Sequence, residues 1–171
     1  MTEEDLRNLG LTSWAAIPAE EIVFSQEVRD MCAANQCGKY GTTWACPPAV
    51  GTLEECREKC LQYSSAFVFS AVYPLEDSFD FEGMMEGHDH FQCVCRKLRG
   101  LLEEPFLLLS NEGCARCKTC TYPDAPCRFP DELSPSVEGY GIFVTQLAKR
   151  AGIPYYGGPN TVTYFGLVCF D

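Results

Sequence analysis

The stretch AFVFSAVY, residues 66–73, decides the fold, because its aromatic and β-branched side chains predict a buried β-strand. Two other stretches have the same character. The all-apolar run FLLL, residues 106–109, and the stretch TVTYFGLVCF, residues 161–170, both predict buried strands. Gly166 in the last stretch indicates a bulge or close packing at that position. With another strand expected over residues 15–24, the chain encodes a sheet of about four strands.

Helical patterns alternate with these strands. TLEECREKCLQY, residues 52–63, begins with a capping box in which Thr52 caps the helix and Glu55 reaches back to the N–H of Thr52. A second helix is expected over about residues 88–102, ended by Pro105. A third is expected from Ser134 and Pro135 until Gly152 and Pro154 stop it. Its apolar stripe consists of Val137, Tyr140, Val144, Leu147, Ala148 and Ala151.

Length and composition favour a single domain over residues 1–171, because 171 residues with 46% apolar content bury one ordinary core. The predicted elements then form an α+β or α/β fold, in which about three helices pack on a mixed sheet. Two cysteine-rich loops interrupt this pattern, one over about residues 31–50 and one over about residues 113–130.

The second loop contains CARCKTCTYPDAPCRFP, residues 114–130, with cysteines that fit an iron–sulfur site. Two consecutive Cys-x-x-Cys steps let three sulfurs converge while backbone N–H groups point inward toward a cubane cluster. Zinc sites usually use two separated ligand pairs, so the triplet favours iron–sulfur over zinc. Zinc bound by the same four cysteines, as a structural or interaction module, is the alternative. These candidate ligands are Cys114, Cys117, Cys120 and Cys127.

The first loop, MCAANQCGKYGTTWACPP over residues 31–48, holds a looser group made of Cys32, Cys37 and Cys46. Its glycines permit close approach of the backbone, and Tyr40 and Trp44 are expected to shield a cluster. The proline after Cys46 is typical of ferredoxin motifs. These three cysteines are therefore candidate ligands of a second site.

These motifs resemble the cysteine-rich predicted metal-binding proteins known as domain of unknown function 2284. The resemblance covers most of the chain and implies metal binding, of iron–sulfur type, in mostly anaerobic organisms. It rests on Cys32, Cys37, Tyr40, Gly41, Cys46, Pro47, Pro48, Cys114, Cys117, Cys120, Tyr122, Pro123, Cys127, Arg128, Phe129, Pro130, Ser136, Glu138, Tyr140, Gly141, Tyr164, Phe165 and Gly166.

The two groups supply seven thiols, whereas two all-cysteine [4Fe-4S] clusters need eight. The candidates for an eighth ligand are Cys56 and Cys60, which lie four residues apart on one helix face, and Cys93, Cys95 and Cys169. Each of these is more simply a small core residue. Cys127 also has the option of crossing to the other cluster, as in two-cluster ferredoxins. Without an eighth thiol, one iron keeps a position open to a non-protein ligand.

The net charge of −11 and the pI near 4.6 argue against binding to nucleic acid. No apolar run is long enough to span a membrane, and the acidic start MTEEDLRNLG does not fit a signal peptide. We therefore expect a cytoplasmic protein with reduced thiols. Four basic residues lie within the loops and either offset thiolate charge or bind a small anion or an acidic partner. They are Lys39, Arg116, Lys118 and Arg128.

The leading functional hypothesis is one-electron transfer by two [4Fe-4S] clusters to a partner protein. The alternative is a [4Fe-4S] enzyme whose open iron binds a small anionic or sulfur-containing substrate. His88 and His90 are expected to start a helix in solvent, with metal ligation as the alternative. The chain contains no phosphate-binding loop, dinucleotide-binding motif, HExxH or nucleophile elbow.

Overall fold

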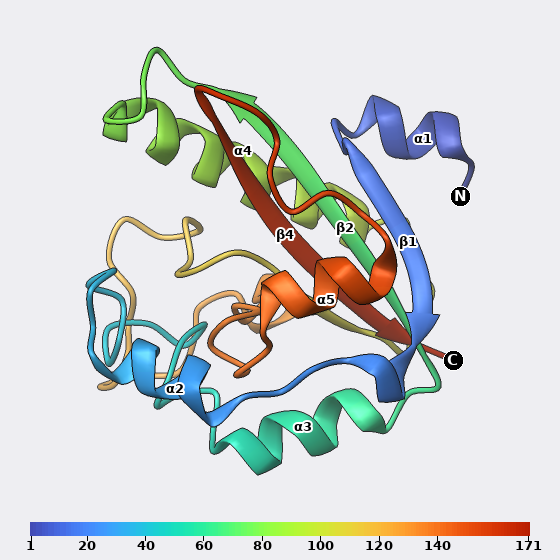
Figure 1. Cartoon of the computed structure of the whole chain (residues 1–171). Coiled ribbons are helices and arrows are strands. Elements are labelled where there is room, and N and C mark those ends of the chain that lie inside the picture. Colours follow the sequence, from blue (N-terminus) through green and yellow to red (C-terminus); the bar gives the residue numbers. More distant parts are fainter.

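The computed structural model describes all residues from Met1 to Asp171 and contains one four-stranded sheet. The strand order is β1-β2-β4-β3, as Figure 1 shows for β1, β2 and β4. Strands β2 and β4 pair along ten residues each and form the centre of the sheet. The strands are β1 (Ser13–Pro18), β2 (Ser65–Pro74), β3 (Leu107–Leu109) and β4 (Thr161–Phe170).

The expected α+β class is confirmed, but the sheet is antiparallel throughout and not mixed. Strands β2 and β4 each begin opposite the residue at which the neighbouring, earlier strand ends. Pro18 at the end of β1 pairs with Ser65 at the start of β2, and Pro74 at the end of β2 pairs with Thr161 at the start of β4. A parallel pair would need a crossover that returns the chain to the opposite end of the sheet.

Five α-helices and two short 3₁₀ helices surround the sheet, where about three helices were expected. In Figure 1, α5 lies in front of the central strands and α4 behind them, with α3 near the lower end of the sheet. None of the helices combines the length and the apolar character that a membrane crossing requires. The helices are α1 (Glu3–Asn8), α2 (Gln26–Ala33), α3 (Leu53–Leu61), α4 (Phe81–Arg99) and α5 (Val144–Ala151), with η1 (Ala19–Glu21) and η2 (Pro130–Glu132).

Side chains that alternate along the central strands form a separate core on each face of the sheet. On β2, Val68 belongs to the core shared with α3 and α5, whereas Phe69 belongs to the core shared with α4. On β4, Leu167 and Val168 divide between the two cores in the same way. This alternation follows from the two-residue repeat of a strand and explains why both central strands are almost entirely apolar.

The capping box at the start of α3 is confirmed, because the N–H of Glu55 donates to Thr52 Oγ1 at 3.2 Å and the N–H of Thr52 donates to Glu55 Oε2 at 2.7 Å. Helix α4 begins seven residues before its expected start at residue 88. Asp80 caps this earlier start by accepting a hydrogen bond from the N–H of Gly83 at 2.9 Å. Helices α1 and α2 were not predicted from the sequence.

The third predicted helix was wrong in its first half. The N–H of Ser136 donates to Ala45 O, and the N–H of Val137 donates to Ser110 O, so this backbone bonds to two other segments. Gly141, with a φ of 75°, then breaks the chain away from helical geometry. Helix α5 therefore begins at Val144 and ends, as expected, at the left-handed Gly152.

Gly166 marks close packing, one of the two readings expected from the sequence. It lies opposite Phe69 in the β2–β4 register, and the Phe69 ring occupies the space that a Cβ at position 166 would need. Phe69 is itself fully buried against Phe91 of α4, with 5.8 Å between ring centroids. The ring has no room to move away.

We predict that Gly166→Ala lowers the free energy of unfolding by about 1–3 kcal/mol, the usual range for overpacking a core. Urea denaturation of the anaerobically purified protein measures the change. Gly100→Ala is the control, because Gly100 ends α4 with a right-handed φ of −68° and no side chain lies against it. Equal stability changes in the two variants would contradict the packing argument.

Candidate metal centres

The seven cysteines of the two motifs line two separate cavities. The four-thiol site contains Cys114, Cys117, Cys120 and Cys127, and the three-thiol site contains Cys32, Cys37 and Cys46. Cys127 thus lies with the rest of its own motif and does not cross to the other group. The sulfurs surround a space instead of meeting at one point, and no three His, Cys, Asp or Glu side chains converge on a single-ion position.

The four-thiol site is closed over by the first cysteine loop. Trp44 of that loop lines the cavity, and its indole Nε1 donates to Thr121 Oγ1 at 3.3 Å and to Ala125 O at 3.1 Å. The Trp44 ring also meets Tyr122 edge to face, with 4.9 Å between centroids. Trp44 therefore ties the two loops together, beyond the shielding role expected from the sequence.

Hydrogen bonds to sulfur control the electrostatics of the four-thiol site. Burial raises the pKa of the Cys120 thiol, but hydrogen bonds from the backbone of Tyr122 and Trp44 and from the side chain of Thr43 outweigh burial, so the pKa lies below its usual value. The N–H of Tyr122 lies 3.5 Å from Cys120 Sγ. Burial raises the pKa of Cys114 against an opposing backbone hydrogen bond from Arg116. Such donors stabilise the thiolate form that binds metal.

The three-thiol site surrounds a cavity of about 210 Å³. Cys46 is buried and accepts a hydrogen bond from the N–H of Gly113 at 3.3 Å. Cys32 is half-buried, whereas Cys37 is exposed. Burial and the neighbouring thiol of Cys46 raise the pKa of Cys32 to about 11, and burial also raises the pKa of Cys46. These thiols therefore need a cation to replace their protons at neutral pH.

A buried carboxylate faces the same cavity. Glu138 lines it, and burial raises the pKa of this carboxyl group to about 7. Its Oε2 atom is shielded from solvent and has no hydrogen-bond partner. A buried oxygen of this kind is costly unless a donor or cation satisfies it. Three thiols and an unpaired carboxylate oxygen are a donor set that fits a bound metal centre.

The two sites are joined by very short stretches of chain. Gly113 donates its N–H to Cys46 of the three-thiol site, and the next residue, Cys114, belongs to the four-thiol site. In the other direction, the backbone of Trp44 hydrogen-bonds Cys120, and Cys46 follows two residues later. The two cavities are therefore neighbours, lined by nearby residues of the same two loops.

Helix α4 holds the start of the second loop in place. Gln92 donates from Nε2 to Gly113 O at 3.2 Å and accepts at Oε1 from the N–H of Ala115 at 2.6 Å. His88 Nε2 contacts Glu112 O, and Asn111 Nδ2 donates to His88 O at 3.3 Å. The residues on both sides of Cys114 are thus fixed by one helix.

The expectation that His88 starts a helix in solvent was wrong. His88 lies in the middle of α4 and is only 5% exposed, because the helix begins earlier and this face turns toward the second loop. His90 is exposed, and its Nδ1 lies 3.1 Å from the Tyr73 hydroxyl. The role of Gln92 in holding the second loop was not predicted from the sequence. A polar pair at positions 88 and 92, within the apolar stripe that contains Phe91 and Cys95, is the sequence signal that could have found it.

The remaining cysteines line neither site, and all twelve cysteines are free thiols. Cys56, Cys60 and Cys169 are fully buried in the core shared with α3 and α5, and Cys95 is buried in the core shared with α4. Cys93 is half-buried on α4. The structure therefore brings no eighth thiol to either cavity.

The four basic residues of the loops differ in their surroundings. Arg116 pairs with Glu132 at 2.6 Å and stacks on Phe129 at 3.7 Å from the ring centroid, so a carboxylate already matches its charge. Arg128 donates to Thr119 O at 2.9 Å and braces its own loop. Lys39 lines the three-thiol cavity, and Lys118 is exposed. Arg116 and Arg128 both line the four-thiol cavity, whereas Lys39 lines the other, so the four do not lie in one cluster.

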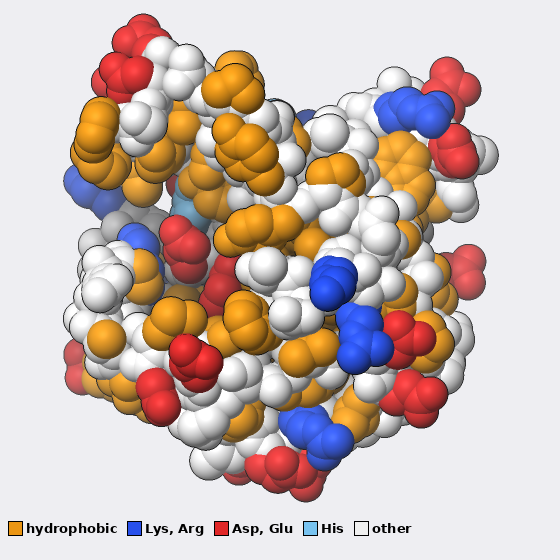
Figure 2. Space-filling model, viewed as in Figure 1, with side chains coloured by type: hydrophobic (Ala, Val, Ile, Leu, Met, Phe, Trp, Pro, Cys, Tyr) orange, Lys and Arg blue, Asp and Glu red, His pale blue; other side chains and the backbone are white.

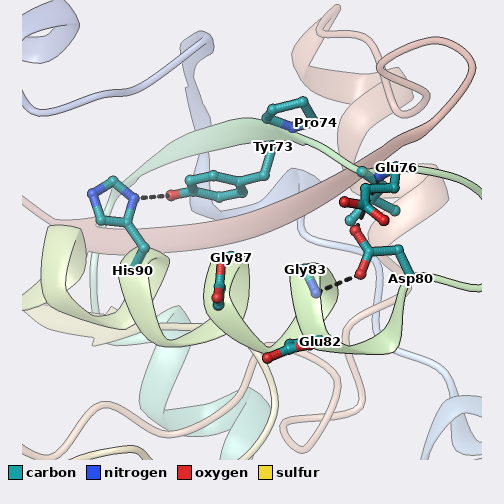
Figure 3. A pocket seen from close by; sticks show the side chains of 10 residues that line it. Tyr73, Pro74, Glu76, Asp80, Glu82, Gly83, Gly87 and His90 are labelled. Carbon is teal, nitrogen blue, oxygen red and sulfur yellow. Dashed lines mark hydrogen bonds between the residues drawn. The ribbon is translucent and has the colours of Figure 1, made fainter.

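Two hollows on the surface contain acidic side chains. Figure 2 shows a hollow on the left side of this face, with acidic side chains and a histidine in it. Figure 3 shows a separate open pocket between the end of β2 and the start of α4, lined by acidic residues, Tyr73 and His90. No cysteine lines that pocket, and Asp80 there serves as the cap of α4. The cavities lined by the motif cysteines therefore lie only at the two loops.

We predict that Gln92→Leu speeds release of metal from the protein to a chelator by about 10–100-fold, the usual effect of losing an outer-shell partner of a metal site. The variant removes both hydrogen bonds that flank Cys114. Gln62→Leu is the control, because Gln62 is exposed at the end of α3. Equal release rates in the two variants would show that α4 does not position the loop.

Comparison with known proteins identifies a family for the chain. Neither the curated proteins nor the solved structures contain a match to the chain. Residues 15–170 match the family described as predicted metal-binding proteins, DUF2284, and this range includes both cysteine loops. The chain therefore belongs to the DUF2284 family of predicted metal-binding proteins.

Proposed function

We propose that the protein is an iron–sulfur protein with a [4Fe-4S] cluster in each site, and that it passes single electrons to a partner protein. The observation that carries this proposal is the direct connection between the sites. Cys46 of one site accepts a hydrogen bond from Gly113, whose neighbour Cys114 belongs to the other site. One hydrogen bond and one peptide unit give electrons a short path between two centres.

Several features of the sites favour clusters over zinc. The thiols surround cavities, whereas the ligands of a structural zinc ion meet at a single tetrahedral point. Backbone N–H groups of Tyr122 and Gly113 point at thiol sulfurs, and N–H donors of this kind tune the potential of iron–sulfur clusters. Zinc in the four-thiol site is the outcome that would overturn the proposal.

The protein residues around the four-thiol site have defined roles in this function. Bound [4Fe-4S] clusters supply reversible one-electron oxidation and reduction. Trp44, Phe129 and Leu133 line the cavity and exclude water from it. Helix α4 holds the loop rigid through Gln92, which keeps structural change during electron transfer small. The three-thiol site is more open, since Cys37 and Met31 at its rim are exposed, and it is the natural contact point for a partner.

The count of thiols favours a second candidate function. Only three cysteines line the open cavity of about 210 Å³, so a cluster there has one iron without a thiolate. Such an iron acts as a Lewis acid toward a small anionic or sulfur-containing substrate. A shift of the reduced-state EPR spectrum on adding such a compound would favour catalysis, and reversible redox cycling unaffected by it favours electron transfer.

We predict about eight irons and eight acid-labile sulfides per chain in anaerobically purified protein, following the composition of two cubane clusters. Cys117→Ala and Cys37→Ala each remove about half of both, because each variant disables one site. Cys93→Ser is the control and keeps the full content, since Cys93 lines neither cavity. Stoichiometric zinc without sulfide would overturn the proposal.

A second prediction concerns the proximity of the sites. After full reduction with dithionite, the wild-type EPR spectrum shows two interacting spins, seen as broadened or split features. Cys37→Ala and Cys117→Ala each give a simple spectrum of one isolated cluster. Two additive, non-interacting signals in the wild type would contradict transfer through the Gly113–Cys114 connection.

A further inference from the structure

We propose that the carboxylate of Glu138 is the fourth protein ligand of the cluster in the three-thiol site. The site then has three cysteine ligands and one glutamate, which completes the ligand set without an eighth cysteine. This inference rests on the proposed function and deepens it, since it identifies what closes the open corner of the second cluster.

Glu138 lies in the correct place for this role. It lines the cavity together with all three cysteines of the site. Cys32 Sγ lies 3.7 Å from the main-chain oxygen of Glu138, although the two residues are 106 positions apart in the sequence. The Oε2 atom of Glu138 is buried and has no hydrogen-bond partner.

The buried Oε2 atom of Glu138 has no partner in the protein, and a cation would stabilise it. The structure has two buried side-chain polar atoms without a hydrogen-bond partner, Arg99 Nε and Glu138 Oε2. The Arg99 guanidinium is otherwise engaged, because its Nη2 donates to Leu133 O and Ser134 Oγ. Glu138 takes part in none of the ion pairs of the structure. An iron atom in the cavity is the partner that would satisfy this oxygen.

The turn that carries Glu138 is held rigidly against the Cys46 segment. Ser136 donates its N–H to Ala45 O at 2.9 Å, and the N–H of Gly139 donates to Ser136 Oγ at 2.9 Å. Gly139 packs so closely that an added Cβ would lie 3.0 Å from Pro47 Cδ. Residues on both sides of Cys46 thus contact residues on both sides of Glu138. Such preorganisation is what a metal ligand requires.

Glu112 provides the internal comparison. It is half-buried and lines the same cavity, but it carries no buried oxygen without a partner. Its backbone oxygen contacts His88 and its neighbour Gly113 bonds to Cys46. Glu112 therefore lines the same cavity as Glu138 and has the same type of side chain, but it lacks the buried, unpaired oxygen on which the proposal depends.

A carboxylate ligand has a measurable consequence. Oxygen is a harder ligand than thiolate and binds cluster iron less firmly. One-electron oxidation by ferricyanide takes the cluster to its 3+ level, from which release of one Fe²⁺ leaves a three-iron cluster of charge 1+. The iron at the glutamate corner is the one released. The four-thiol cluster keeps its iron under the same conditions.

The test is a ferricyanide titration of the full-length, anaerobically purified protein, followed by EPR and Mössbauer spectroscopy and by iron analysis. The wild type releases one iron per chain and gains a three-iron signal. Glu138→Cys supplies a fourth thiolate and slows this release by about tenfold or more, and Glu138→Ala speeds it by a similar factor, in line with ligand-shell changes at metal sites. Glu112→Gln behaves like the wild type.

Cyanide addition gives a second readout. We expect cyanide to shift the EPR signal of the three-thiol cluster at once in Glu138→Ala, and only slowly in the wild type, where it must displace the carboxylate. The inference would be overturned if Glu138→Ala and Glu138→Cys released iron and bound cyanide at the same rates as the wild type. The fourth iron of this cluster would then have no ligand from the protein. The unchanged Mössbauer signal of the four-thiol cluster in its diamagnetic 2+ state shows that each variant is folded. Protein without acid-labile sulfide would instead overturn the proposed function itself.

Discussion

The antiparallel ladder between β2 and β4 is the constraint on which the rest of the structure depends. Its ten-residue length creates two apolar faces, and α4 covers one while α3 and α5 cover the other. Strand β3 pairs with β4 and delivers the chain directly into the second cysteine loop. Because α4 packs on the same ladder, its residues Gln92 and His88 meet the loop where that strand ends. The sheet thereby places both the loop and its support.

The two cysteine sites depend on each other because their loops exchange contacts. Trp44 of the first loop covers the four-thiol site, and Gly113 of the second loop donates a hydrogen bond to Cys46 of the three-thiol site. Exchanged contacts of this kind exclude water and hold the thiols at fixed positions. Fixed thiols favour metal binding and keep structural change during electron transfer small. The arrangement also explains how an acidic chain places many thiols close together, since N–H donors partly offset thiolate charge.

Local signals in the sequence predicted the elements whose side-chain pattern is distinct within the element itself. The strands at residues 66–73 and 161–170 agree with β2 and β4 to within a residue, and the Thr52–Glu55 capping box is present. The predictions that were wrong involve competition with distant segments. Ser136 and Val137 have helical spacing, but their N–H groups bond to Ala45 and Ser110, so the helix begins at Val144. His88 looked like a solvent-exposed residue because the start of α4 was placed too late.

The sequence by itself determined the grouping of cysteines into two motifs, the main strands and the family of the chain, because these features reside in short spacings and side-chain character. Only the tertiary structure decided that the motifs form two neighbouring cavities, that Cys56 and Cys60 lie in the core, and that Glu138, with its buried unpaired oxygen, lines the same cavity as Cys32. The physical reason is that these relations join residues far apart in the chain. Cys32 and Glu138 are 106 positions apart, and only the packing of the loops on the sheet and on each other brings them together.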